Sequence, residues 1–161
     1  MTKRPFVLLQ AASLASFIDG SSTFILVPLL ALQTTGSSAL AALVIGASAV
    51  PSLLITPFVG GLIDRFGRRR LAIWTELTTG LAVACIPLVA ATIGMNVWWL
   101  VLLTVLRSIF GAGSVSARKA LLPDVAEKAG MTLDRANSIG EAVSSAGFAI
   151  GPAIAATILN K

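Results

Sequence analysis

The stretch "GGLIDRFGRRR", residues 60–70, contains five charged residues and three glycines. It follows a long, mostly apolar run that carries no charge after Asp19. Apolar runs of roughly 20 residues are long enough to cross a bilayer as a helix, and Lys and Arg collect at the ends of such helices. The stretch therefore predicts a charged loop between two membrane-spanning helices.

The composition of the whole chain agrees with this prediction. Of its 161 residues, 56% are hydrophobic and only 12% are charged, against about 25% charged in soluble domains. A net charge of +5 could indicate a nucleic-acid partner, but that interpretation needs basic residues clustered on a soluble face. Here they follow or precede apolar runs, so we expect membrane lipid as a partner and no nucleic acid.

Five apolar stretches are long enough to span a membrane. Prolines and glycines inside them are tolerated in membrane helices, and the short alternating strands of a β-barrel do not fit. We expect an all-α membrane protein with a partial N-terminal bundle over residues 1–161 and cytoplasmic loops at 64–70 and 118–136. The predicted spans are residues 6–32, 39–63, 71–93, 97–117 and 137–159.

Basic residues predict the orientation, because Lys and Arg accumulate on the cytoplasmic side. Connectors 33–38 and 94–96 contain no charge, whereas the other side holds most of the basic residues. The N-terminus is therefore expected in the cytoplasm of a multi-pass cell-membrane protein. These basic residues are Lys3, Arg4, Arg65, Arg68, Arg69, Arg70, Arg118, Lys119, Lys128 and Arg135.

A secretory signal peptide is an alternative for the N-terminus, because Lys3 and Arg4 precede an apolar run that ends in small residues. The apolar pattern resumes beyond Asp19, which makes it longer than a signal-peptide core of about 7–15 residues. Removal of this segment would leave the orientation of the later spans unchanged.

Four ionisable residues lie within or near the predicted spans. Asp19 and Arg107 fall at similar depths near the middle of the bilayer, where charged residues usually face the bundle interior and form a pair or a pathway. They form either a permanent structural pair or part of a transport site. Glu76 and Glu141 lie nearer the inner interface, where anchoring is the simpler role. The candidate substrate or proton pathway comprises Asp19, Arg107 and Glu141.

Hydroxyl side chains surround Asp19 in the first predicted span. They make it the most polar intramembrane surface in the chain, and we place substrate or proton contact there, opposite Arg107. These side chains are Ser13, Ser16, Ser21, Ser22 and Thr23.

The residues needed for most enzyme sites are missing from the sequence. Cys85 is the only cysteine and there is no histidine, which argues against a Cys/His metal site. No glycine-rich loop ends in Lys-Ser or Lys-Thr, as a phosphate-binding loop would. The sequence therefore predicts no metal, no cofactor and no enzymatic activity.

Three motifs together resemble those of the major facilitator superfamily. The loop motif has the order Gly60-x-x-x-Asp64-Arg65-x-Gly67-x-Arg69-Arg70. The fourth span contains Arg107-x-x-x-Gly111-x-Gly113, with Phe110 where many members have glutamine. The fifth contains Gly147-x-x-x-Gly151-Pro152, which is similar to the antiporter motif of drug exporters.

Further residues are similar to the branch that contains macrolide-efflux proteins and the enterobactin exporter. They are Asp19-Gly20, "LLPDV" at 121–125 and "RANSI" at 135–139. Each motif alone also has an ordinary explanation, as a topology anchor or a close helix contact. Their order and their agreement with the predicted topology favour the family.

The resemblance implies a secondary transporter, in which two six-helix halves rock about a central site. It implies that the loop of residues 60–70 is a conformational latch and that the fifth span bends to seal the cavity of a proton-coupled exporter. From the residues alone, Asp64 could accept hydrogen bonds from a helix N-terminus or pair with an arginine.

The resemblance covers the first half of such a transporter without its sixth helix. We therefore expect a truncated chain that lacks its C-terminal half and cannot transport its small amphiphilic substrate alone. The alternative is a complete short membrane protein that binds or regulates a transporter, or that self-assembles.

Overall fold

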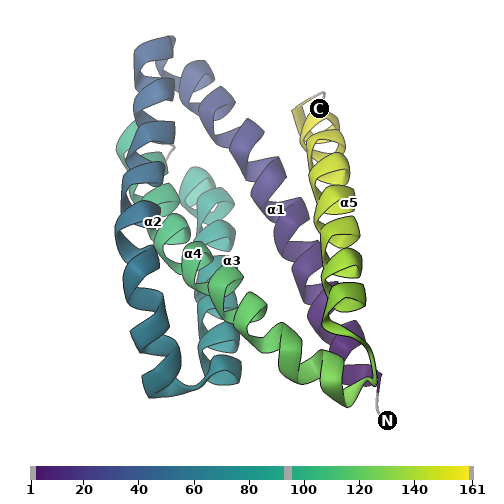
Figure 1. The fold of residues 1–161 in the computed structure, drawn as a ribbon. Helices are drawn as coiled ribbons and strands as arrows, with labels where there is room; N and C mark the ends of the chain where they lie inside the picture. The colour runs from purple at the N-terminus through teal and green to yellow at the C-terminus, as the bar shows by residue number, and fades with distance from the viewer. Residues whose placement is uncertain (1–2, 93–95, 160–161) are drawn as a thin grey trace. The chain divides into compact units, whose positions relative to one another are not determined.

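The computed structural model describes residues 3–92 and 96–159, and these residues form helices joined by short connectors (Figure 1). Four of the helices, α1, α2, α4 and α5, are long and apolar enough to cross a membrane. An all-helical fold is therefore confirmed for the described residues, and a membrane crossing by α3 stays a prediction. The helices are α1 (Arg4–Thr35), α2 (Ser38–Phe66), α3 (Arg68–Thr92), α4 (Val97–Lys128) and α5 (Leu133–Leu159).

The connectors are shorter than the sequence predicted. The expected loop at 64–70 is reduced to Gly67, since its flanking residues belong to α2 and α3. Most of the expected loop at 118–136 is helical, because α4 continues to Lys128 and α5 begins at Leu133. The predicted spans followed hydrophobicity, whereas backbone hydrogen bonding continues through polar residues once a helix is formed.

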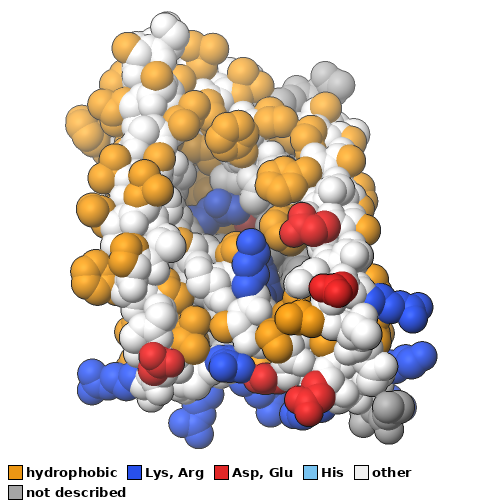
Figure 2. Space-filling model, viewed as in Figure 1, with side chains coloured by type: hydrophobic (Ala, Val, Ile, Leu, Met, Phe, Trp, Pro, Cys, Tyr) orange, Lys and Arg blue, Asp and Glu red, His pale blue; other side chains and the backbone are white. Residues whose placement is uncertain are grey.

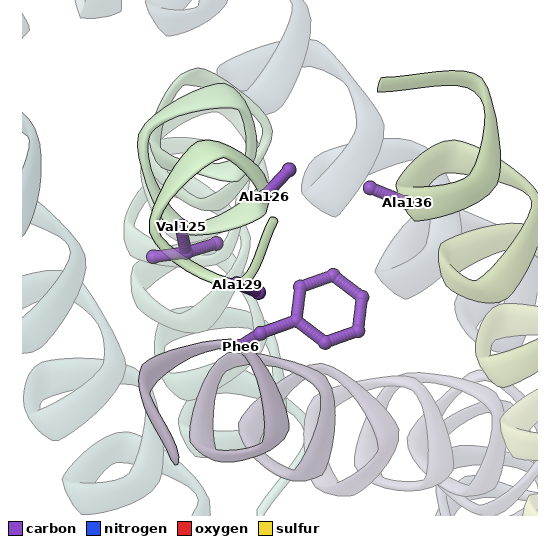
Figure 3. Close-up of a cluster of buried hydrophobic side chains, with 5 residues drawn as sticks. All are labelled: Phe6, Val125, Ala126, Ala129 and Ala136. Atoms are coloured by element: carbon purple, nitrogen blue, oxygen red, sulfur yellow. The ribbon is translucent and has the colours of Figure 1, made fainter. Parts of the chain in front are cut away.

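The chain divides into two compact units, and the first contains residues 1–26 and 118–161. Within its described part, the beginning of α1, the end of α4 and α5 meet around the Phe6 ring (Figure 3). The alanines around this ring let the helix backbones come close. The buried cluster comprises Phe6, Val125, Ala126, Ala129 and Ala136.

The second unit contains residues 27–117. The end of α1, the start of α2 and the start of α4 share the buried side chains of Val27, Ala31, Val44 and Leu100. Leu100 and Val44 are fully buried, which ties these three segments together. Each unit thus has an apolar cluster of its own.

Large hydrophobic side chains cover the outside of several helices. Leu53 and Phe58 on α2 and Leu77 and Leu81 on α3 are exposed. Figure 2 shows hydrophobic side chains along α2 and charged side chains gathered at the end where α2 turns into α3. Soluble monomers rarely expose contiguous apolar surface of this kind, and it suits contact with lipid tails.

Candidate functional site

The first unit holds a close, parallel contact between α1 and α5. Phe6 shares a cluster with Ala136, and Cβ atoms built at Gly140, Gly147 and Gly151 would meet Gln10, Phe17 and Ser21. In each of these pairs the residue numbers differ by 130. A constant offset means that the helices run in the same direction and remain in contact over several turns, as two spans of the same orientation would.

Gly147 and Gly151 allow this approach because glycine has no side chain. The contact is so close that neither position has room for a Cβ atom. A Cβ at Gly147 would lie 2.5 Å from Phe17 Cβ, and one at Gly151 would lie 1.9 Å from Ser21 Oγ and 2.7 Å from Ile18 O. The Phe17 and Phe148 rings add a tilted contact, with centroids 5.7 Å apart. The motif that the sequence identified is therefore a helix-packing motif in this structure.

Ser21 and Ser22 belong to this contact, so in this structure they are buried between α1 and α5. Ser21 is 5% exposed and Ser22 is 8% exposed. Ser22 Oγ donates to the carbonyl oxygen of Gly151 at 2.9 Å. Ser21 Oγ lies 3.1 Å from the carbonyl oxygen of Gly147 and 2.8 Å from that of Phe17. The Ser21 hydroxyl has one proton, so these two carbonyl oxygens share it as acceptors. Apolar surroundings leave such hydroxyls few other partners.

Asp19 is two residues from both Phe17 and Ser21, a spacing that points it away from these two contact residues. Ser16, Asp19 and Thr23 are three and four residues apart, a spacing that places them on one helix face. The Thr23 hydroxyl donates to Asp19 Oδ1 at 3.5 Å, a long hydrogen bond. Glu141, the other acidic candidate of this unit, is exposed on α5. The tertiary contacts thus divide the hydroxyls of α1 between a packing face and the Asp19 face.

Arg118 is placed differently from its sequence interpretation as a loop residue. It lies inside α4 and is only 7% exposed, and its Nη1 donates to Ser16 Oγ at 2.7 Å. The contact therefore reaches the face of α1 that carries Asp19. The neighbouring Lys119 is exposed.

The second unit holds Arg107 and the rest of its motif on α4. Gly113 packs against α3, since a Cβ there would lie 3.0 Å from Thr75 Cγ2, whereas a Cβ at Gly111 would meet nothing within 4 Å. One residue further along, the Ser114 hydroxyl donates to Glu76 Oε2. Glu76 on α3 therefore accepts a hydrogen bond from α4. The sequence predicted only an anchoring role at the inner interface and did not predict this contact between helices.

The turn between α2 and α3 lies at a charged surface of the second unit. Gly67 has φ 82° and ψ 143°, a combination that is essentially restricted to glycine. Its N–H donates to Ile63 O at 2.8 Å and its carbonyl accepts from Leu71 N at 3.1 Å, so it ends one helix and starts the next. Arg65 lies over the Phe66 ring, 5.7 Å from its centroid. The charged residues Asp64, Arg65, Arg69 and Arg70 are exposed.

Sequence reasoning missed the roles of Arg118 and Ser114. Arg118 followed the apparent end of a span, and Ser114 is one of many serines in the chain. The depths of Arg118 and Ser114 along α4 could have suggested contacts with Ser16 and Glu76. Such a prediction requires knowing which helices are neighbours, and the sequence does not give this. Within residues 3–92 and 96–159, no group of three or more His, Cys, Asp or Glu residues could hold a metal ion.

Comparison with known proteins places these motifs in a family. The family model "Major Facilitator Superfamily" matches residues 11–161. A "Multidrug efflux pump Tap" of Mycolicibacterium fortuitum is 38% identical over 95% of this chain and 38% of its own length. The protein of the same name from Mycobacterium tuberculosis is 40% identical over 92% of this chain and 36% of its own length.

A more distant relative supports the branch that the motifs indicated. "Macrolide efflux protein A" of Streptococcus pyogenes is 22% identical over 98% of this chain and 38% of its own length. No solved structure matches the chain. The chain spans less than two fifths of the length of these relatives. Because the family model covers nearly all of its residues and the motifs occupy the expected helices, the chain is a multi-pass membrane protein that belongs to the major facilitator superfamily, a family of transporters rather than enzymes.

Proposed function

We propose that this chain forms the first helices of a proton-coupled exporter of small amphiphilic molecules. The observation that carries the proposal is the identity of 38–40% to two multidrug efflux pumps over nearly the whole chain. The glycine contact between α1 and α5 supports it, because it gives the antiporter-like motif a defined packing role. The alternative of a short regulatory membrane protein is not favoured by these comparisons.

In this proposal Asp19 is the proton-binding group. It is an acid in a helix apolar enough to cross a membrane, where ionisable residues are costly and usually functional. Thr23 and Ser16 supply hydroxyls on the same face of α1. Arg107, at a similar predicted depth in α4, is the proposed partner, and Glu141 is a further candidate for the pathway. A permanent structural pair of Asp19 and Arg107 is the competing hypothesis.

The proposed moving element is the part of α5 around Pro152. Proline has no N–H, so the carbonyl of Phe148 four residues earlier lacks its helical hydrogen bond and the helix can bend there. Gly147 and Gly151 hold the residues before this break against α1. A bend in α5 would therefore be transmitted to the helix that carries Asp19.

The turn at Gly67 is the proposed latch. Its exposed charges, Asp64, Arg65, Arg69 and Arg70, are available to groups outside the second unit. Charge-assisted pairs that form in one conformation and break in another can shift a two-state equilibrium by a few kcal/mol. We propose that the partner groups and the rest of the cavity belong to the remainder of the exporter, and we expect residues 1–161 alone not to transport.

The test is transport by the full-length protein in proteoliposomes. Asp19→Asn should abolish proton-driven export and leave substrate exchange without a proton gradient largely intact, because the amide cannot release a proton. Asp134→Asn is the matched control, since Asp134 is an exposed acid in the first turn of α5. Proton-driven export by Asp19→Asn at the wild-type rate would reject Asp19 as the proton site.

A measurement of folded yield in detergent separates the two hypotheses for Arg107. If Asp19 and Arg107 form a structural pair, Arg107→Ala and Asp19→Asn should both reduce the folded yield, because each leaves one charge of the pair uncompensated. Wild-type yields with a selective loss of transport would favour the transport role.

A further inference from the structure

Arg118 is a buried cation that the proposed mechanism does not use. It lies ten residues before the end of α4 at Lys128, and Ser16 lies twelve residues after the start of α1 at Arg4. At 1.5 Å per residue these separations are about 15 and 18 Å, measured from the same end of two antiparallel segments. Arg118 is therefore within the bundle of the first unit, well away from the helix ends.

Asp19 is the acid whose position best suits compensation of the Arg118 charge. A buried guanidinium is costly unless it is hydrogen-bonded and compensated by negative charge, and the Ser16 hydroxyl is neutral. Among the described acids of the first unit, Glu127, Asp134 and Glu141 are exposed, whereas Asp19 and Asp124 are half-buried. Asp124 is on α4 itself, six residues beyond Arg118, whereas side chains on one helix face each other at a spacing of three or four residues. Asp19 stands one turn from Ser16, on the α1 face that Arg118 contacts.

We propose that Arg118 is a positioning residue for the Asp19 site. By donating to Ser16 it fixes the rotation of α1, and it places a positive charge beside the face that bears Asp19. An ionised carboxylate is attracted to this charge and a protonated one is not. The contact therefore makes the force between α1 and α4 depend on whether Asp19 carries a proton. This inference rests on the proposed function.

The test compares four variants of the full-length protein in proteoliposomes. Arg118→Gln removes the charge, Arg118→Lys keeps it, Ser16→Ala removes the acceptor, and Lys119→Gln removes an exposed charge next to Arg118 as the control. We expect Arg118→Gln to lower proton-driven export about tenfold, in the range of ordinary coupling between sites, and to change exchange without a gradient by less than about twofold. Arg118→Lys should restore most of the export, and Lys119→Gln should match wild type.

Two results would overturn the inference. One is proton-driven export by Arg118→Gln at the wild-type rate. The other is an equal loss of exchange and of proton-driven export, which would indicate a structural role only. If Arg118→Gln does not fold in detergent, Ser16→Ala decides: coupled export at the wild-type rate by the folded Ser16→Ala protein would reject the proposal.

Asp19→Asn, measured alongside, separates this inference from the proposed function. If Asp19→Asn exports normally, the proton site is wrong whatever Arg118 does. If Asp19→Asn loses coupling and Arg118→Gln does not, only the role of Arg118 fails. We expect the double variant to be no worse than Asp19→Asn alone, because residues that act through one site are not additive.

Discussion

The α2–α3 turn and the α1–α5 contact both depend on glycine, but for different physical reasons. Gly67 in the turn has positive φ and open space around it, since a Cβ there would meet nothing within 4 Å. Gly151 in the contact lies inside a regular helix and is not among the positive-φ glycines. It has no room for a Cβ, which would lie 1.9 Å from Ser21 Oγ.

This difference shows that one residue type meets two separate needs. At the turn glycine is needed for its backbone conformation, and at the helix contact it is needed for its small volume. Gly60 fits neither need within the described structure, because it is helical, exposed and without a neighbour within 4 Å of a built Cβ. The three positions therefore allow the comparison to be tested by one kind of substitution.

The largest effect is expected for Gly151→Ala. The added methyl group overlaps Ser21 Oγ and Ile18 O, and overpacking of a tight contact costs about 1–3 kcal/mol or more. Unfolding in detergent and SDS should show a clear loss of stability. Ser21→Gly should restore part of it by removing the overlapping side chain.

The control for that experiment is Ala149→Val, which adds methyl groups at an exposed position of α5. It should leave the unfolding midpoint nearly unchanged. Wild-type stability of Gly151→Ala would mean that α1 and α5 do not pack through this motif.

A smaller loss is expected for Gly67→Ala. Its φ of 82° is strained for any residue with a Cβ, and such strain costs on the order of 1 kcal/mol or more. The turn is exposed and can relax, which limits the loss. Gly67→Asn should be milder than Gly67→Ala, since asparagine tolerates positive φ better than alanine. The same unfolding assay ranks the two, and the reverse order would contradict a conformational role.

The smallest effect on stability is expected for Gly60→Ala. Alanine is favoured over glycine inside a helix by about 0.5–1 kcal/mol, so stability should stay equal or rise slightly. If Gly60 belongs to the proposed latch, transport by the proposed full-length exporter should nevertheless fall. Gly61→Ala is the matched control, because Gly61 is also helical, exposed and free of neighbours. Unchanged transport by Gly60→Ala would remove it from the latch.

Much of the architecture could be predicted from the residues alone. Long apolar runs can satisfy their backbone groups in lipid only as helices or closed barrels, and the absence of an alternating pattern excluded barrels. The charged stretch at 60–70 therefore located a turn, and glycine at position 67 matches the backbone conformation found there. The motifs around Gly147 and Arg107 indicated the family before any contact was known.

The tertiary structure decided which polar residues face which neighbours. In the sequence Ser16, Ser21 and Ser22 are equivalent hydroxyls near Asp19, and Arg118 is one more basic residue after an apolar run. Packing assigns Ser21 and Ser22 to the backbone of α5 and joins Ser16 to a buried Arg118. Hydrophobicity indicates which segments can cross a membrane, because each residue contributes nearly independently to burial in lipid. The partner of a side chain depends instead on the rotation and neighbours of its helix, which only the packed structure sets.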